Sequence, residues 1–256
     1  MFKMIYNIAR TELQMLFYSP VAWLILVVFG IQAGLIFAGK IEGLVVSQEM
    51  GYSVAGATFN IFANPWGAVF VNMQNYLYFY IPLLTMSLVS KELSSGSIRL
   101  LYSSPITNLQ IIVGKFVSMM IYGLFMIGIL LLITLCSWSV IKDFDWPMVF
   151  VGLLGLYLLI CAYAAIGIFM SSLTSYQIVA AIGTFAVLMV LSMIGDWWQE
   201  YDFVRDVTYW LAMPGRSGKF IAGLICSEDV LYFVIVVCLF LALTIIRLNS
   251  VRQKIR

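Results

Sequence analysis

Residues 148–170, MVFVGLLGLYLLICAYAAIGIFM, run for 23 positions without a charged side chain. About 20 apolar residues in a helix are enough to cross the roughly 30 Å hydrocarbon core of a bilayer. In lipid, backbone groups must form their hydrogen bonds within their own segment, so a uniform apolar run of this length is expected to be helical. Across the whole chain, 63% of residues are hydrophobic, 10% are charged and the mean hydropathy is +1.02. We therefore predict an all-α integral membrane protein.

Six stretches are long and apolar enough to be transmembrane helices. They cover residues 20–38, 66–89, 111–138, 148–170, 178–194 and 230–246. Residues 1–18 precede them as an amphipathic helix that can lie in the membrane interface. Lys3 and Arg10 give this region some likeness to a secretory signal, but no convincing small-residue cleavage site follows, so we interpret residues 20–38 as a mature span. Residues 1–256 are assigned to one transmembrane domain.

Charge predicts the orientation of these spans. One side of the membrane would carry the N-terminal segment, residues 90–115, the hairpin at 171–177 and the C-terminal tail. That side holds 9 of the 14 Lys and Arg residues but, of the 12 acidic residues, only Glu12 and Glu92. Lys and Arg accumulate in cytoplasmic loops. Both termini and the loop at 90–115 are therefore predicted to be cytoplasmic.

The loop at 90–115, SKELSSGSIRLLYSSPITNLQIIVGK, is a polar segment between the second and third predicted spans. Its first part is predicted to be a two-faced helix that ends at Pro105, because proline lacks the N–H that a continuing helix needs. The apolar face comprises Leu93, Ile98, Leu100 and Leu101, and the polar face comprises Lys91, Glu92, Ser94, Ser95 and Arg99. A protein outside the membrane could bind this loop. The alternative is a basic loop that is simply solvated.

Amides and aromatic hydroxyls mark the second predicted span. Because an amide facing lipid would lack hydrogen-bond partners, these side chains either pack between helices or line a substrate route. The candidate route residues are Asn72, Gln74, Asn75 and Tyr78, with Gln32 and Thr184 as weaker candidates in other spans. On the other side of the membrane, residues 195–229 are predicted to form short outer-side helices. Their aromatic residues either anchor the chain at headgroup depth or form a gate or substrate contact, and they include Trp197, Trp198 and Trp210.

Several function classes are disfavoured by what the sequence lacks. There is no histidine, which removes the usual neutral-pH proton shuttle and the commonest metal ligand, and the four cysteines show no CxxC spacing. We predict no metal site, no catalytic residue, and cysteines that act as small buried hydrophobic residues. No GxxxxGK[ST] phosphate loop is present, so the chain is not expected to bind ATP. The predicted spans are almost free of charge, which disfavours a proton-coupled carrier.

Two stretches carry a family pattern. The loop combines an acidic residue, a glycine, a leucine pair, a small-Pro-Ile-Thr turn and Gly-Lys, at Glu92, Gly96, Leu100, Leu101, Ser104, Pro105, Ile106, Thr107, Gly114 and Lys115. Together with the order of the predicted elements, this pattern resembles the membrane subunit of ABC-2 type ABC transporters. The run EDVLYF at 228–233 is similar to the branch that contains the gliding-motility-associated permease and the permease for nitrous oxide reductase maturation.

The resemblance implies a non-enzymatic permease subunit of the cell inner membrane. It implies cytoplasmic ABC ATPase subunits that bind ATP and Mg²⁺, and a second permease copy or a homologous permease, with no cofactor on this chain and no nucleic acid partner. Residues 91–106 would form a coupling helix that sits in a cleft of the ATPase. Its contact residues would be Lys91, Glu92, Gly96, Ser97, Arg99, Leu100, Leu101 and Pro105, with Gly96 permitting close backbone approach.

Alternatives remain open at this point. ATP hydrolysis could drive export, or it could drive conformational work at the outer face on extracytoplasmic proteins, where an accessory protein would be a further partner. A stand-alone channel or secondary carrier is the alternative from a different class, and it would transport without an ATPase.

Overall fold

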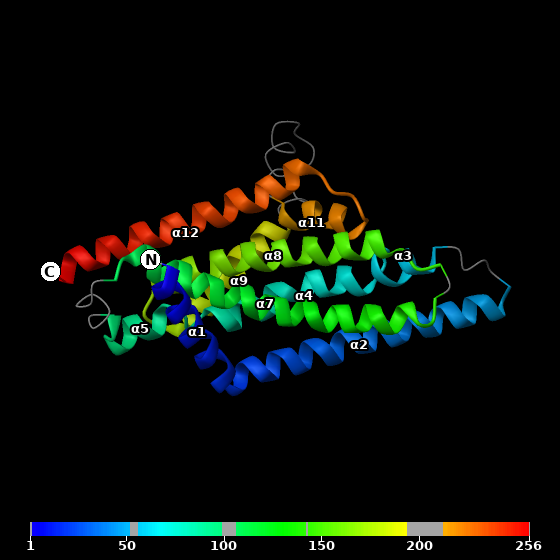
Figure 1. The fold of residues 1–256 in the computed structure, drawn as a ribbon, viewed down its shortest axis with the longest axis horizontal. Coiled ribbons are helices and arrows are strands. Elements are labelled where there is room, and N and C mark those ends of the chain that lie inside the picture. Colours follow the sequence, from blue (N-terminus) through cyan, green and yellow to red (C-terminus); the bar gives the residue numbers. More distant parts are fainter. Residues whose placement is uncertain (1, 52–55, 99–105, 142, 194–211, 256) are drawn as a thin grey trace.

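The structure is a computed structural model that describes residues 2–51, 56–98, 106–141, 143–193 and 212–255 (Figure 1). These residues form helices joined by turns, with no strand among them, so the all-α prediction is confirmed. The helices are α1 (Phe2–Tyr18), α2 (Pro20–Glu49), α3 (Ala57–Phe62), α4 (Val69–Thr85), α5 (Ser90–Ser95), α7 (Asn108–Trp138), α8 (Trp146–Leu173), α9 (Gln177–Met193), α11 (Met213–Ile221) and α12 (Ser227–Ile255).

The long helices form an elongated bundle (Figure 1). Both termini and α5 lie at one end, which we call the α5 end, and α3 lies towards the other end with the C-terminus of α2, which we call the α3 end. α8 is the central helix, because it packs against α4, α7, α9, α11 and α12. Two of its glycines leave room for these neighbours: a Cβ at Gly155 would lie 2.3 Å from the Cβ of Phe220, and one at Gly167 would lie 2.2 Å from Oγ1 of Thr85.

Four of the described helices, α2, α7, α8 and α12, are long and apolar enough to cross a membrane, and α9 is apolar but shorter. The chain is therefore a multi-pass membrane protein. The second predicted span, 66–89, corresponds to a helix of only 17 residues, α4. It starts late because Gly67 adopts φ +82° in a turn, and it is followed by further turn residues after Thr85. The count of six spans stays a prediction.

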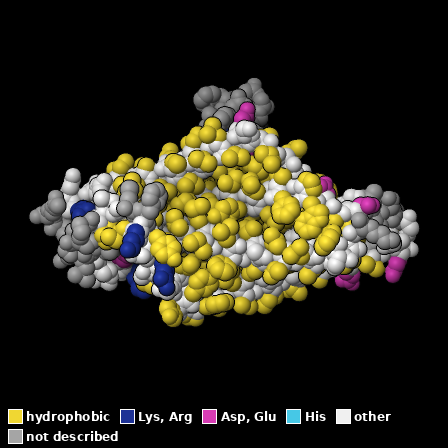
Figure 2. Space-filling view, in the orientation of Figure 1, with side chains coloured by type: hydrophobic (Ala, Val, Ile, Leu, Met, Phe, Trp, Pro, Cys, Tyr) yellow, Lys and Arg dark blue, Asp and Glu magenta, His cyan; other side chains and the backbone are white. Residues whose placement is uncertain are grey.

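The surface matches a membrane location. In Figure 2, hydrophobic side chains cover the middle of the visible face. On this face, Lys and Arg side chains gather at the α5 end, and most of the acidic side chains lie towards the α3 end. Large apolar residues are exposed along the length of α2, including Leu24, Val28, Ile31 and Leu35. Such a surface would be unfavourable in water and is stable in lipid.

Local sequence signals fix the corner between α1 and α2 and the start of α7, which both lie near the site. α1 ends at Ser19, which is extended, and Pro20 then starts α2 at a position where its missing N–H costs nothing. The hydroxyl of Tyr122 in α7 donates to the backbone oxygen of Ala22 at 2.7 Å, which holds the start of α2 against α7. α7 itself begins with a capping box between Thr107 and Gln110.

Candidate functional site

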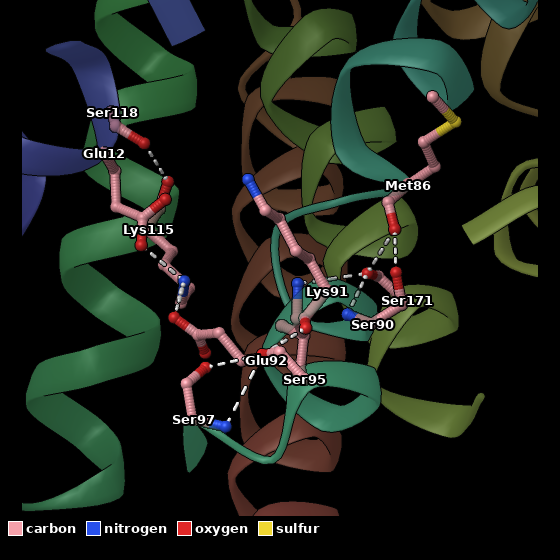
Figure 3. Close-up of polar contacts among 11 residues, drawn as sticks. Glu12, Met86, Ser90, Lys91, Glu92, Ser95, Ser97, Lys115, Ser118 and Ser171 are labelled. Carbon is pink, nitrogen blue, oxygen red and sulfur yellow. Dashed lines mark hydrogen bonds and ion pairs between the residues drawn. The ribbon is translucent and has the colours of Figure 1, made fainter. Parts of the chain in front are cut away.

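The turn between α4 and α5 is held by a serine from the α8–α9 hairpin. The backbone N–H groups of Val89 and Ser90 donate to Oγ of Ser171 at 3.1 and 3.0 Å. The same hydroxyl donates to the backbone oxygen of Met86 at 2.9 Å, and Ser90 Oγ also donates to that oxygen (Figure 3). Because Ser171 is fully buried, water cannot supply hydrogen bonds there, and these polar groups bond to one another instead. The position of α5 is thereby tied to α8.

α5 is a single short helical segment, and Gly96 ends it. Gly96 has φ +70°, a left-handed conformation that a residue with a Cβ adopts only at a cost. A Cβ at this position would have no neighbour within 4 Å. Within this chain, Gly96 therefore has a conformational role, and its close approach to an ATPase stays a prediction. Ser95 Oγ donates to the backbone oxygen of Lys91 at 2.8 Å and lies 2.9 Å from Oγ of Ser97 (Figure 3).

A buried ion-pair triad joins three helices beside this turn. Nζ of Lys115 in α7 lies 2.5 Å from Oε1 of Glu12 in α1 and 2.7 Å from Oε1 of Glu92 in α5 (Figure 3). The side chains of Lys115, Glu12 and Glu92 are 2%, 10% and 20% exposed. Charges this deep are costly unless they are paired with good geometry. The triad therefore fixes α1 and α5 to the same point on α7.

The triad is not predicted from the sequence, in which the spans are almost free of charge and Glu92 is expected to contact an external partner. The available signal was Lys115 itself, a lone charge inside the apolar run 111–138. The neighbouring glycine completes the arrangement: a Cβ at Gly114 would lie 2.7 Å from Cγ2 of Ile8 in α1. The Gly-Lys pair thus lets α1 lie close against α7 and supplies the charge that holds it there.

The triad contains two carboxylates for one ammonium. The pKa of the Glu92 carboxyl is raised, chiefly because burial disfavours its charged form. The Lys115 ammonium lowers this pKa in part, and the negative charge of Glu12 raises it further. A cavity of about 400 Å³ opens beside these groups. It lies between the α1–α2 corner, the end of α4, α5 and α7, and Glu12, Glu92 and Lys115 are among its lining residues.

The predicted coupling residues fall into different environments. Lys91 is exposed, Ser97 is half-buried and Glu92 belongs to the triad. On the predicted apolar face, Leu93 packs against the core and Ile98 is buried. Four members of the set lie outside the described residues, namely Arg99, Leu100, Leu101 and Pro105. The described part of the segment therefore faces the bundle with its apolar side and leaves Lys91 at the surface.

The predicted route residues lie in different environments. Gln74 is buried, accepts a hydrogen bond from Ser217 Oγ at 3.0 Å and donates to the backbone oxygen of Pro214 at 3.3 Å, which are packing contacts with α11. Asn75 is exposed, and Tyr78 packs on Phe79 with ring centroids 4.8 Å apart.

Asn72 donates to the backbone oxygen of Ala68 at 3.0 Å and lines a cavity of about 620 Å³ between α2 and the α3–α4 turn. Gln32 accepts a hydrogen bond from Tyr80, and Thr184 donates to the backbone oxygen of Ala180 at 2.7 Å. The outer-side residues Trp197, Trp198 and Trp210 lie outside the described residues.

A second buried ion pair connects α11 to α12. Arg216 NH1 lies 2.6 Å from Oδ1 of Asp229, and Lys219 Nζ lies 3.6 Å from Oδ2 of the same carboxylate. The Arg216 guanidinium also lies 4.4 Å from the ring centroid of Tyr232. Asp229 and Tyr232 are part of the EDVLYF run, so that run has a structural role here. Among the described residues, no group of three or more His, Cys, Asp or Glu side chains could hold a metal ion.

Comparison with protein families decides the class of this fold. The model of the ABC-2 family transporter protein matches residues 6–199, which include most of α1, all of α5 and α7, and the whole triad. The chain belongs to the ABC-2 transporter family. Membership implies a permease component of an ABC transporter, a membrane transport part that is generally non-catalytic and associates with an ABC ATPase. The match ends before α11 and α12, and no curated protein matches the sequence of this ABC-2 protein.

Proposed function

We propose that this ABC-2 permease couples ATP hydrolysis by cytoplasmic ATPase subunits to export, or to conformational work at the outer membrane face. The observation that carries the proposal is the attachment of α5 at two points. Ser171 holds the α4–α5 turn to α8, and Glu92 holds α5 to Lys115 of α7. A force on α5 would therefore act on two membrane-crossing helices together.

The proposal needs an element with two arrangements that ATP binding can bias. Residues 91–106 are proposed as the coupling segment. It begins with α5, on which Lys91 is exposed for contact with the ATPase. ATP and Mg²⁺ would bind on the ATPase. The ATPase subunits would act on two permeases, this chain with a second copy or with a homologous permease, and an accessory protein could join them outside the membrane.

We further propose that both termini and α5 face the cytoplasm, in the cell inner membrane. The concentration of Lys and Arg at the α5 end supports this orientation. Single cysteines test it in a variant whose four native cysteines are replaced by serine. A membrane-impermeant maleimide should label Ser95→Cys from the cytoplasmic side only and Gln48→Cys, exposed at the α3 end, from the outside only. The reverse pattern would refute the orientation.

A substrate route is a second proposed role, for the exposed surface of α4. Asn75 is exposed there, and Phe79 packs against Phe185 of α9 with ring centroids 5.0 Å apart. An exposed amide in a membrane helix calls for a polar partner, which a second permease or a polar substrate would supply. The EDVLYF run supports a relation to the gliding-motility and nitrous-oxide-maturation branch, which stays a proposal.

Affinity purification from native membranes tests the coupling proposal. The tagged chain should co-purify with an ATPase that carries a phosphate-loop sequence, and Lys91→Glu should weaken that association by reversing an exposed charge on α5. Lys3→Glu is the matched control, because Lys3 is exposed at the same end but lies on α1. Wild-type association and ATP turnover in Lys91→Glu would contradict the assignment of α5. Transport by the chain without any ATPase would favour a channel or carrier.

A further inference from the structure

The cavity of about 400 Å³ beside the triad is not used by the coupling proposal. It lies where two corners of the chain meet, at Ser19 between α1 and α2 and at Met86–Leu88 between α4 and α5. Its volume falls within the range of sites that bind small molecules, about 300–1,000 Å³. Its position at the α5 end places it near the boundary between the apolar surface and the charged residues.

The floor of the cavity has an unbalanced negative charge. Glu12 and Glu92 share the single ammonium of Lys115, and each uses only its Oε1. The Oε2 atoms of both carboxylates form no hydrogen bond with any described residue. A carboxylate that is nine-tenths buried, as Glu12 is, is stabilised by a further donor. The floor therefore suits a cationic group that carries N–H bonds.

The rim of the cavity has the opposite character. Lys91 lines it with an ammonium that forms no ion pair or hydrogen bond among the described residues, and Ser95 and Ser97 add hydroxyl groups. Glu12 and Glu92 are the two acidic residues of the lining, and both belong to the floor. An anionic group such as a phosphate would be favoured at this rim.

The walls of the cavity are apolar. They come from α1, the start of α2 and the end of α4, and comprise Met15, Leu16, Val21, Ala22, Leu83, Leu84 and Leu88. A ligand that fits the whole site therefore has a primary ammonium and a phosphate a few bonds apart, followed by a hydrocarbon chain. A free amine or a free anion would match only one part.

We propose that this cavity binds a phospholipid with a phosphoethanolamine headgroup. The ammonium donates to the free carboxylate oxygens of Glu12 and Glu92, the phosphate pairs with Lys91, and an acyl chain follows the apolar wall. Phosphatidylcholine cannot replace it, because its quaternary ammonium has no N–H to donate, and phosphatidylglycerol has no cationic group. The bound lipid fills the space between the two corners and supports α5.

Lipid retention by the full chain tests this proposal. Detergent-purified protein is incubated with equimolar dioleoyl phosphatidylethanolamine, phosphatidylcholine and phosphatidylglycerol, and the lipids that stay bound are counted by native mass spectrometry. The wild type should retain phosphatidylethanolamine about tenfold more strongly than the other two, the ratio expected from roughly one lost charge-assisted hydrogen bond. Equal retention of the three lipids, or a preference for phosphatidylcholine or phosphatidylglycerol, would overturn the proposal.

Two variants at exposed lining positions avoid disturbing the triad. Lys91→Met removes the contact to the phosphate, which all three lipids share, so it should lower the total amount of lipid retained. Val21→Trp fills the cavity from α2 and should abolish the selectivity. Val27→Trp is the matched control, since Val27 is also exposed on α2 but does not line the cavity. Wild-type amounts of bound lipid in Lys91→Met, or wild-type selectivity in Val21→Trp, would refute the site. If the wild-type chain showed the lipid selectivity but co-purified with no ATPase, the coupling proposal alone would be refuted.

Discussion

Replacement of Lys115 by methionine tests the central claim that the triad holds α1 and α5 to α7. Methionine keeps a long unbranched side chain but removes the ammonium, so Glu12 and Glu92 lose their shared partner while remaining largely buried. Removing one member of a buried ion pair costs about 3–5 kcal/mol, because the remaining charge is left uncompensated. We expect a loss of folding free energy in this range for Lys115→Met.

Unfolding by sodium dodecyl sulfate in mixed micelles, followed by tryptophan fluorescence, measures this loss. Lys3→Met is the matched control, because Lys3 is exposed, and it should change the free energy of unfolding by less than about 0.5 kcal/mol. A triple variant with Lys115→Met, Glu12→Gln and Glu92→Gln should recover most of the loss, since it leaves no unpaired charge.

The single carboxylate variants sharpen the test. Glu12→Gln leaves Lys115 paired with Glu92, so it should cost clearly less than Lys115→Met. The reasoning would be refuted if Lys115→Met lost less than about 1 kcal/mol, the usual limit for an exposed ion pair. It would also be refuted if the triple variant were no more stable than Lys115→Met.

Three further predictions concern other contacts. Glu92 has a raised pKa in the folded protein, so its contribution to stability is complete below the ordinary glutamate pKa of about 4.3 and is lost as pH rises through the raised pKa. Glu92→Gln should therefore flatten the dependence of Tm on pH between these two pKa values. Gly155→Ala should lower the free energy of unfolding by about 1–3 kcal/mol, because the new Cβ would lie 2.3 Å from the Cβ of Phe220 in α11. Gly128→Ala is the control: its Cβ would have no neighbour within 4 Å, so it should be neutral or slightly stabilising. Equal Tm values for the two variants would contradict the packing of α8 against α11. Arg216→Met should lower Tm strongly, because the buried carboxylate of Asp229 in α12 loses its partner at 2.6 Å. An unchanged Tm would contradict the burial of this pair.

Some features of the candidate site were readable from the sequence. The sequence predicts one polar loop at 90–115, and α5 lies within it. The family pattern also marks Glu92 and Gly96 as candidate contacts with an ATPase. The structure adds a role for each within the chain: Glu92 pairs with Lys115, and Gly96 ends α5 in a left-handed conformation. A pattern marks a residue as special without showing which atoms surround it, because that depends on helices from elsewhere in the chain.

The sequence by itself determined the class of this protein. Long apolar runs such as 148–170 must form helices in lipid, since the backbone has no other hydrogen-bond partner there. Only the tertiary structure decided what the few charges do. Lys115 and Glu12 are 103 positions apart, and they meet because Gly114 lets α1 lie against α7. Helix formation follows from local composition, whereas the pairing of buried charges follows from packing, which no single stretch of sequence contains.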